Sequence, residues 1–220
     1  MATTQILFIR HGETAWNRIK RIQGHIDIPL AETGLAQAQR LAERLARDAR
    51  DGARIDAIYS SDLQRAQQTA QPSATALGLP LVLNAGLRER SYGVFQGHDS
   101  TEIEARFPDA YAAWQTRDPG FEPDGGESQR AFYHRVLHAI EPIVAAHPGG
   151  RIACVAHGGV LDCVYRFANG LALAEPRHYQ LLNTSINVVD YVDGHAQVVS
   201  WADVAHLADG SDDDGYGRVL

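Results

Sequence analysis

The residues QILFIRHG, at positions 5–12, join a short apolar run directly to an arginine, a histidine and a glycine. A short apolar run that ends in polar and glycine residues is typical of a buried strand that opens into a loop. The residues RIACVAHGG, at positions 151–159, repeat this pattern. We therefore expect two buried strands, 5–9 and 151–156, and each is followed closely by a histidine.

Two helices are predicted between these strands. Residues 33–50 place Leu35, Ala38, Leu41 and Leu45 at helical spacing among charged residues, which indicates an amphipathic helix.

The segment 61–77 also has a helical pattern, which Asp62 is expected to cap and Pro72 to disturb. The other predicted elements are a short helix within 14–23, strands at 55–60, 79–84, 185–192 and 196–201, short helices near 100–106 and 108–117, and helices at 128–146 and 160–169.

Strands that alternate with helices predict an α/β fold, a three-layer sandwich with a mainly parallel central sheet. In open sheets of this kind, ligands bind beyond the carboxyl ends of the strands. His11 and His157 both follow such strand ends. We expect the two imidazoles to lie at the same edge of the sheet.

The length of 220 residues suits a single domain, 1–220. Within it, residues 86–127 are irregular and rich in aromatic residues, Gly and Pro, so we expect a substrate lid there. Residues 207–220 are acidic and are expected to form a loosely held tail.

The charge and the amino terminus bear on partners and location. A formal net charge of -7 argues against a nucleic-acid partner, whereas a small phosphorylated metabolite needs only a local cluster of cations in a cleft. No apolar run has the length of a membrane span, and MATTQILFIRHG lacks the pattern of a signal peptide. We expect a cytoplasmic protein without a membrane partner. A homodimer is left open.

Phosphoryl transfer to a side chain requires a nucleophile, cations around the phosphoryl oxygens and an acid for the leaving oxygen. His11 is the candidate nucleophile, with Arg10 beside it. Arg65, in the first turn of a predicted helix, and Glu89, after a predicted strand, can reach the same edge of the sheet. Further candidates are Asn17 and the glycines Gly12 and Gly24, whose N–H groups can approach a phosphate.

The sequence resembles the histidine phosphatase superfamily, the phosphoglycerate mutase-like clan, over nearly its whole length. The resemblance is carried by RHGETAWN (10–17), QGHIDIPLAETGLAQA (23–38), SSDLQRAQQTA (60–70), LRERSYGVFQG (87–97), GGES (125–128) and VAHGGV (155–160).

The resemblance implies a role for each matching residue. His11 would be phosphorylated, and Glu89 would protonate the leaving oxygen and then activate water. Arg10, Arg65 and His157 would surround the phosphoryl oxygens. The phosphate-binding set would be completed by Asn17, Gln23, Gly24 and Gly158. No metal and no other cofactor would be needed.

Three functions are weighed. The preferred one is a metal-independent phosphomonoester hydrolase of the phosphatase branch. The first alternative is a cofactor-dependent phosphoglycerate mutase. In those mutases, a longer insertion between the general acid and the second histidine supplies basic residues that bind the substrate, and this chain departs from that pattern. Here the interval 89–157 is short and contains no lysine. The second alternative is a catalytically dead phosphate-binding module, which the retained set of site residues disfavours.

Several residues are given a structural interpretation instead. Cys154 and Cys163 are read as buried thiols, and His134 and His138 as exposed helix residues rather than a metal pair. The acids of 212–214 lack the ligand spacing of a calcium loop. Glu13 and Glu102 are rivals to Glu89 as the acid, and Arg90 could pair with Glu89. The aromatic residues that could line the substrate mouth or pack in the core are Trp16, Tyr92, Phe95, Trp114 and Phe121.

Overall fold

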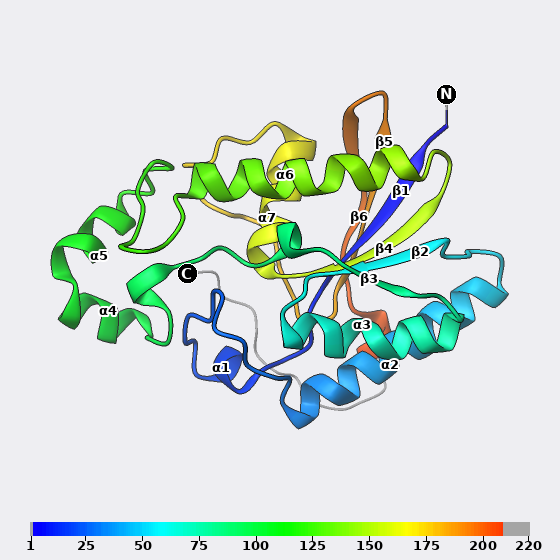
Figure 1. The fold of residues 1–220 in the computed structure, drawn as a ribbon, viewed down its shortest axis with the longest axis horizontal. Coiled ribbons are helices and arrows are strands. Elements are labelled where there is room, and N and C mark those ends of the chain that lie inside the picture. Colours follow the sequence, from blue (N-terminus) through cyan, green and yellow to red (C-terminus); the bar gives the residue numbers. More distant parts are fainter. Residues whose placement is uncertain (1, 209–220) are drawn as a thin grey trace.

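The computed structural model describes residues 2–208 and contains a six-stranded sheet (Figure 1). The strands are β1 (Thr4–Arg10), β2 (Ala57–Ser60), β3 (Leu81–Leu83), β4 (Arg151–Ala156), β5 (Ile186–Val192) and β6 (His195–Asp203). They lie in the order β3-β2-β4-β1-β5-β6. The first four in this order are parallel, while β5 and β6 pair antiparallel at one side. The predicted α/β fold with a mainly parallel sheet is confirmed.

The alternation of side chains along β1 builds both cores. Ile6 and Phe8 are fully buried in one hydrophobic cluster, while Leu7 and Ile9 are buried in the other. Successive residues of a strand point to opposite faces, so a run that is apolar at every position requires cover on both sides.

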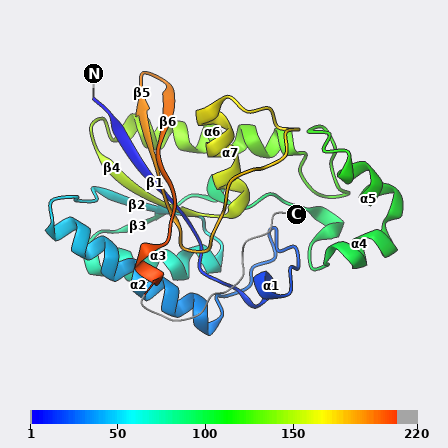
Figure 2. The same ribbon diagram turned by 180° about the vertical axis from the view of Figure 1, so that it is seen from behind.

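Helices supply that cover (Figures 1 and 2). α2 (Glu32–Arg50) and α3 (Gln64–Leu77) pack on one face, and α6 (Gln129–Ala146) and α7 (Gly158–Asn169) pack on the other. The result is the predicted three-layer sandwich. The shorter elements are α1 (Ala15–Arg18), α4 (Ser100–Arg106), α5 (Pro108–Gln115) and the 3-10 turns η1 (Ala85–Leu87), η2 (Gly93–Phe95) and η3 (Ala205–Leu207).

The amphipathic pattern of α2 holds for Ala38, Leu41 and Leu45, which are buried. It fails at Leu35, which is 49% exposed. The first turn of α2 instead approaches the loop after β1 through Gly34, where an added Cβ would lie 2.1 Å from the carbonyl oxygen of Glu13. The close contact at this end is therefore made by backbone, and Leu35 is left at the surface.

The predicted start and break of α3 are wrong. The helix continues through Pro72, because its buried face of small residues, including Ala66 and Ala70, packs in the core and outweighs the lost hydrogen bond. The carboxylate of Asp62 accepts two hydrogen bonds from Arg88 and does not cap the helix. A carboxylate from a distant loop accepts the N–H of the first helical residue instead, since Gln64 N lies 2.6 Å from Asp27 Oδ1.

The segment 86–127 places α4 and α5 at one end of the molecule (Figure 1). Within residues 2–208, no helix combines the length and hydrophobicity that crossing a bilayer requires. Of the tail predicted at 207–220, all but the first two residues lie outside the described part of the chain, and so do the acids of 212–214.

Candidate active site

A cavity of about 210 Å³ lies beyond the carboxyl end of β1. It is lined by Arg10, His11, Asn17, Ile22, Gln23, Gly24, Arg65, Glu89, Tyr92 and Trp114. Seven of the nine predicted site residues are in this set. The other two, His157 and Gly158, do not line the cavity but lie directly against residues that do: the rings of His157 and His11 are 5.2 Å apart, and Gly158 packs beside the Arg10 guanidinium.

The tautomer of His11 is determined by its own loop. Nδ1 lies 2.7 Å from the carbonyl oxygen of Gly12, which can only accept a hydrogen bond, so Nδ1 carries the hydrogen. Burial, followed by the positive charges of Arg65 and Arg10, holds the pKa of His11 well below its ordinary value, although the bond to Gly12 opposes this shift. The ring is therefore neutral at pH 7, and Nε2 keeps its lone pair.

A loop that precedes β5 holds the backbone of His11 and of Arg10 by hydrogen bonds. Asn183 Nδ2 donates to the carbonyl oxygen of His11 at 2.8 Å, and Thr184 N donates to that of Arg10 at 3.0 Å. The Arg10 guanidinium also donates to the carbonyl oxygen of Leu181. The end of β1 is thus held from one side, which orients both side chains in the cavity.

Arg65 is a fully buried cation at the start of α3. It donates to the carbonyl oxygens of Gly24 at 2.8 Å and Ile26 at 3.1 Å. Burial lowers its pKa to about 10, while the nearby carboxylates of Glu89 and Asp27 oppose that shift, so the group is still charged at neutral pH. A buried charge at a cavity wall favours an anionic ligand.

His157 follows the last residue of β4, is the N-cap residue of α7, and is also fully buried. Its Nε2 lies 2.8 Å from Ser61 Oγ, and that hydroxyl already accepts the N–H of Leu63. A hydroxyl has two acceptor positions and one hydrogen, and when Ser61 donates that hydrogen to Nε2, the imidazole hydrogen lies on Nδ1. Within the described residues Nδ1 is buried and has no partner. Burial and the charge of Arg65 hold the pKa of His157 well below its ordinary value.

The carboxylate of Glu89 is held by two backbone groups. Oε1 accepts the N–H of Arg90 at 2.8 Å, and Oε2 accepts the N–H of Gly159 at 3.0 Å. The Arg90 side chain does not pair with it, but donates to the carbonyl oxygens of Glu127 and Phe121. Glu89 therefore lines the cavity with both carboxylate oxygens fixed by backbone hydrogen bonds.

The rival acids are engaged elsewhere and do not line the cavity. Glu13 is buried, pairs with Arg18 and accepts the hydroxyl of Thr33. Glu102 pairs with Arg21 and closes the capping box of α4.

Two amides complete the polar lining. The Oδ1 atom of Asn17 accepts hydrogen bonds from Thr14 in the capping box of α1, which leaves its NH₂ group for the cavity. Gln23 is 9% exposed, and its Oε1 has no partner within the described residues.

The two candidate glycines differ in the structure. The N–H of Gly12 is occupied, because it donates to Thr69 Oγ1 at 2.9 Å, so the prediction that it approaches a phosphate is wrong. Gly24 does line the cavity, in the left-handed conformation (φ +53), and an added Cβ would lie 2.1 Å from Gln96 Oε1. Its carbonyl oxygen is thereby turned to the Arg65 guanidinium.

The aromatic residues divide between the two roles that were left open. Tyr92 and Trp114 line the cavity. Phe95 is fully buried, with the rings of Trp114 at 5.5 Å and Phe121 at 6.3 Å, so it forms the core of the segment 86–127. Trp16 is half-buried and lies outside the cavity lining.

The burial predicted for two cysteines and the exposure predicted for two helix histidines are confirmed. Cys154 and Cys163 are buried and unbridged, and His134 and His138 are exposed on α6. Across residues 2–208, no group of three or more His, Cys, Asp and Glu side chains is arranged to hold a metal ion.

Three residues of the site were not predicted from the sequence. Ser61, within the segment SSDLQRAQQTA (60–70), supplies the hydroxyl that contacts His157. Ile22 lines the cavity next to Gln23. Asn183 braces the His11 backbone from 172 residues away, and no local pattern marks it.

Comparison with known proteins agrees with this arrangement. The description "Histidine phosphatase superfamily (branch 1)" matches residues 6–204. The chain is 41% identical to a metal-independent phosphoserine phosphatase of Arabidopsis thaliana, over 93% of this chain and 84% of the relative. It is 40% identical to phosphoglycerate mutase-like protein 4 of the same plant, over 92% and 86%.

A solved structure is similar over an equal span. It is a mutant phosphoserine phosphatase from Entamoeba histolytica in complex with phosphoserine, with a TM-score of 0.81, 27% identity and coverage of 93% of this chain and 99% of that one. By the match of fold, sequence and family model over almost its whole length, this chain belongs to the histidine phosphatase superfamily, branch 1.

Proposed function

We propose that this protein is a metal-independent phosphomonoester hydrolase that acts on a small phosphorylated metabolite through a phosphohistidine at His11. The observation that carries the proposal is the state of that ring: a neutral imidazole with its lone pair on Nε2, in a cavity that two arginines line. A nucleophile and positive charge around the phosphoryl oxygens are the main requirements of this transfer.

In the first step, Nε2 of His11 attacks phosphorus and the bond to the leaving oxygen breaks. The electron pair of that bond goes to the leaving oxygen, which takes a proton from the Glu89 carboxyl group. Arg10 and Arg65 interact with the non-bridging oxygens. In the second step, the Glu89 carboxylate takes a proton from water, whose oxygen attacks phosphorus, and the bond to Nε2 breaks. Phosphate and the starting enzyme result.

His157 acts as a neutral hydrogen-bond donor in this scheme. We assign it the tautomer in which Ser61 donates to Nε2 and the hydrogen lies on Nδ1, an atom that is buried without a partner within the described chain. An unsatisfied buried donor is costly. A phosphoryl oxygen would satisfy it, and the Ser61 hydroxyl would hold the required tautomer. The amides of Asn17 and Gln23 and the backbone at Gly24 and Gly158 are assigned to the same phosphate-binding site.

The cavity volume suits a small substrate, and the segment 86–127 is proposed as its lid. Glu89, Tyr92 and Trp114 all come from this segment and line the cavity. The phosphoserine bound to the Entamoeba relative shows the size of ligand that such a protein accepts. We therefore place the substrate among phosphorylated metabolites of that size.

The sequence similarity to a phosphoglycerate mutase-like protein makes isomerisation of a phosphorylated metabolite the second candidate function. A mutase acting through a bisphosphate must bind a second anionic group beside the transferred phosphoryl group. The cations that line this cavity are Arg10 and Arg65, and both are assigned to the transferred group. This favours hydrolysis.

Phosphorus NMR of the protein with 3-phosphoglycerate, a trace of 2,3-bisphosphoglycerate and excess EDTA tests the proposal. Growth of inorganic phosphate in EDTA is the expected result. Growth of 2-phosphoglycerate without inorganic phosphate would make the protein a mutase. If neither signal grows, a wider panel of phosphomonoesters follows under the same conditions, and failure to hydrolyse any of them would favour a phosphate-binding module.

A further inference from the structure

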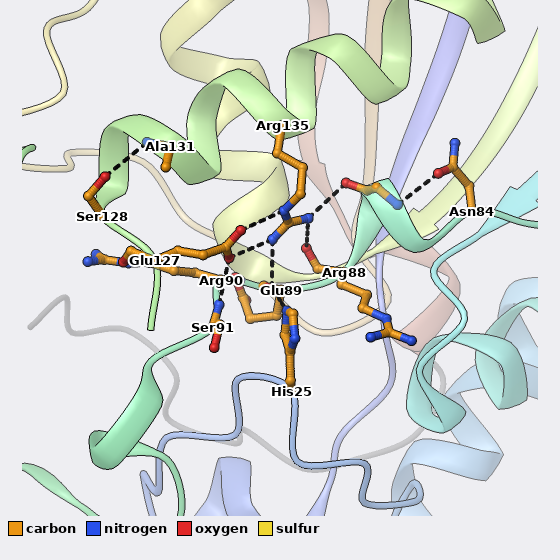
Figure 3. Close-up of polar contacts among 11 residues, drawn as sticks. His25, Asn84, Arg88, Glu89, Arg90, Ser91, Glu127, Ser128, Ala131 and Arg135 are labelled. Carbon is orange, nitrogen blue, oxygen red and sulfur yellow. Dashed lines mark hydrogen bonds and ion pairs between the residues drawn. The ribbon is translucent and has the colours of Figure 1, made fainter. Parts of the chain in front are cut away.

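One guanidinium from α6 bonds several carbonyl groups of the loop that carries Glu89 (Figure 3). Arg135 Nη1 donates to the carbonyl oxygens of Gly86 at 2.9 Å and Arg88 at 3.1 Å, and Nη2 donates to that of Glu89 at 3.1 Å. Three carbonyl groups within four residues therefore converge on one side chain. Arg135 is not part of the cavity lining, and these bonds connect it to the loop that carries Glu89.

Glu127 fixes both the guanidinium and the other end of the loop. Its two carboxylate oxygens accept hydrogen bonds from Arg135 Nε and Nη2, each at 2.8 Å. Oε2 also accepts the N–H of Ser91 at 2.8 Å. Although burial raises the pKa of Glu127, the bonds from Arg135 and from the Ser91 N–H lower it below its ordinary value, so the carboxylate is charged at neutral pH.

A third group holds the loop from the opposite side. His25 Nε2 lies 2.8 Å from the carbonyl oxygen of Glu89, which also accepts from Arg135 (Figure 3). The backbone of Glu89 is thus bonded from two directions, and the N–H two residues later is bonded to Glu127. This arrangement leaves the carboxylate of Glu89 directed at the cavity, where its position relative to a leaving oxygen decides proton transfer.

We propose that Arg135 and Glu127 are positioning residues that hold Glu89 in place for proton transfer to the leaving group. The inference rests on the proposed function, in which Glu89 is the acid. The planar fork of arginine matches both the carboxylate and the carbonyl oxygens, and lysine cannot reproduce these bonds.

The test is leaving-group dependence, which a general loss of folding would not produce. The values of kcat/KM are compared for an alkyl phosphate and for p-nitrophenyl phosphate. For each substrate, kcat/KM reports the steps up to departure of the leaving group. A nitrophenolate leaves with little need of a proton, whereas an alkoxide needs one.

Arg135→Met should lower kcat/KM for the alkyl phosphate about ten- to a hundredfold, and that for p-nitrophenyl phosphate less than about threefold. Arg135→Lys should lie between Arg135→Met and the wild type. Arg130→Met is the matched control, because Arg130 is an exposed arginine on the same helix, and both values should stay unchanged.

Glu89→Gln distinguishes a failure of the proposed acid role of Glu89 from a failure of the proposed positioning role of Arg135. If this variant loses both activities equally, Glu89 is not the acid and the proposed role of the residue fails together with this inference. If Glu89→Gln loses mainly the alkyl activity but Arg135→Met loses both equally or neither, the positioning inference alone is overturned. Should Arg135→Met not fold, Glu127→Gln carries the same test: a preferential loss of alkyl activity supports the inference, and an equal loss or none overturns it.

Discussion

The amide nitrogen of Gly159 lies 3.0 Å from Glu89 Oε2, so the first turn of α7 directly contacts the acid of a loop 70 residues earlier in the chain. An added Cβ at position 159 would lie 2.1 Å from Glu89 Oε1 and 2.9 Å from Phe132 Cε1. Only a residue without a side chain allows the carboxylate to sit against this helix terminus. The glycine after His157 and Gly158 is therefore part of the geometry of the proposed acid.

This contact predicts the effect of Gly159→Ala. The methyl group would displace the Glu89 carboxylate, and we expect kcat/KM for an alkyl phosphate to fall about ten- to a hundredfold. Gly158→Ala should lose less, since its Cβ would lie at ordinary contact distances, 3.6 Å from Arg10 Nε and 4.0 Å from Leu181 Cδ1. Steady-state phosphate release measures both. Wild-type activity in Gly159→Ala would show that the carboxylate does not occupy this position during turnover.

Replacing the proposed nucleophile should remove the covalent route. We expect His11→Ala to reduce turnover at least about a thousandfold, because a missing nucleophile cannot be replaced by neighbouring groups. Phosphate release is measured together with trapping of acid-labile phosphate on the protein, which the variant should lack. His134→Ala, at an exposed position on α6, controls for loss of an imidazole. Turnover in His11→Ala near that of the wild type would contradict the mechanism.

The Ser61 hydroxyl is expected to influence phosphate binding, because it determines the tautomer of His157. In Ser61→Ala, Nε2 of His157 loses its partner, and the hydrogen on Nδ1 is no longer fixed. We expect about tenfold weaker competitive inhibition by vanadate and a loss of about 1–3 kcal/mol in the free energy of unfolding, because a buried polar atom is left unsatisfied.

Ser60→Ala is the matched control for that variant. Ser60 is equally buried, and its hydroxyl donates to the carbonyl oxygen of Ser61, not to the histidine. Vanadate inhibition should therefore stay near the wild-type value. Equal effects of the two substitutions would indicate that Ser61 supports folding alone.

The sequence predicted the parts of this molecule that depend on local patterns. The apolar runs before His11 and His157 are recognisable because a strand buried on both faces has no polar position, and the strand ends then place both rings together. Helix spacing likewise located α2, α6 and α7 within a few residues.

The errors and omissions concern contacts between distant residues. Pro72 is tolerated in α3 because the helix packs in the core, and Asp62 is drawn away from the helix terminus by Arg88. Glu127 lies just before α6 and pairs with Arg135 eight residues later, a separation that is not one of the helical spacings at which side chains are expected to meet. Side chains that act through another residue are the ones that sequence patterns miss.

The buried histidines make stability depend on pH in a defined direction. The pKa values of His11 and His157 lie well below about 6.5 in the folded protein, whereas the unfolded chain titrates near that value. As the pH falls below about 6.5, the unfolded chain binds protons that the folded protein does not, so stability is lost. Each histidine contributes up to about 1.4 kcal/mol per pH unit, until the folded pKa is reached.

His11→Asn should remove one of these contributions. Urea unfolding from about pH 5 to about pH 7.5 measures the free energy of unfolding of the wild type and the variant. The difference between them should change with pH below about 6.5 by about 1.4 kcal/mol per unit, with the wild type losing more on acidification. His134→Asn, at an exposed position, serves as the control for a removed imidazole. Parallel curves for the wild type and His11→Asn would mean that His11 accepts a proton in the folded protein as readily as in the unfolded chain, and the neutral nucleophile proposed here would lose its physical basis.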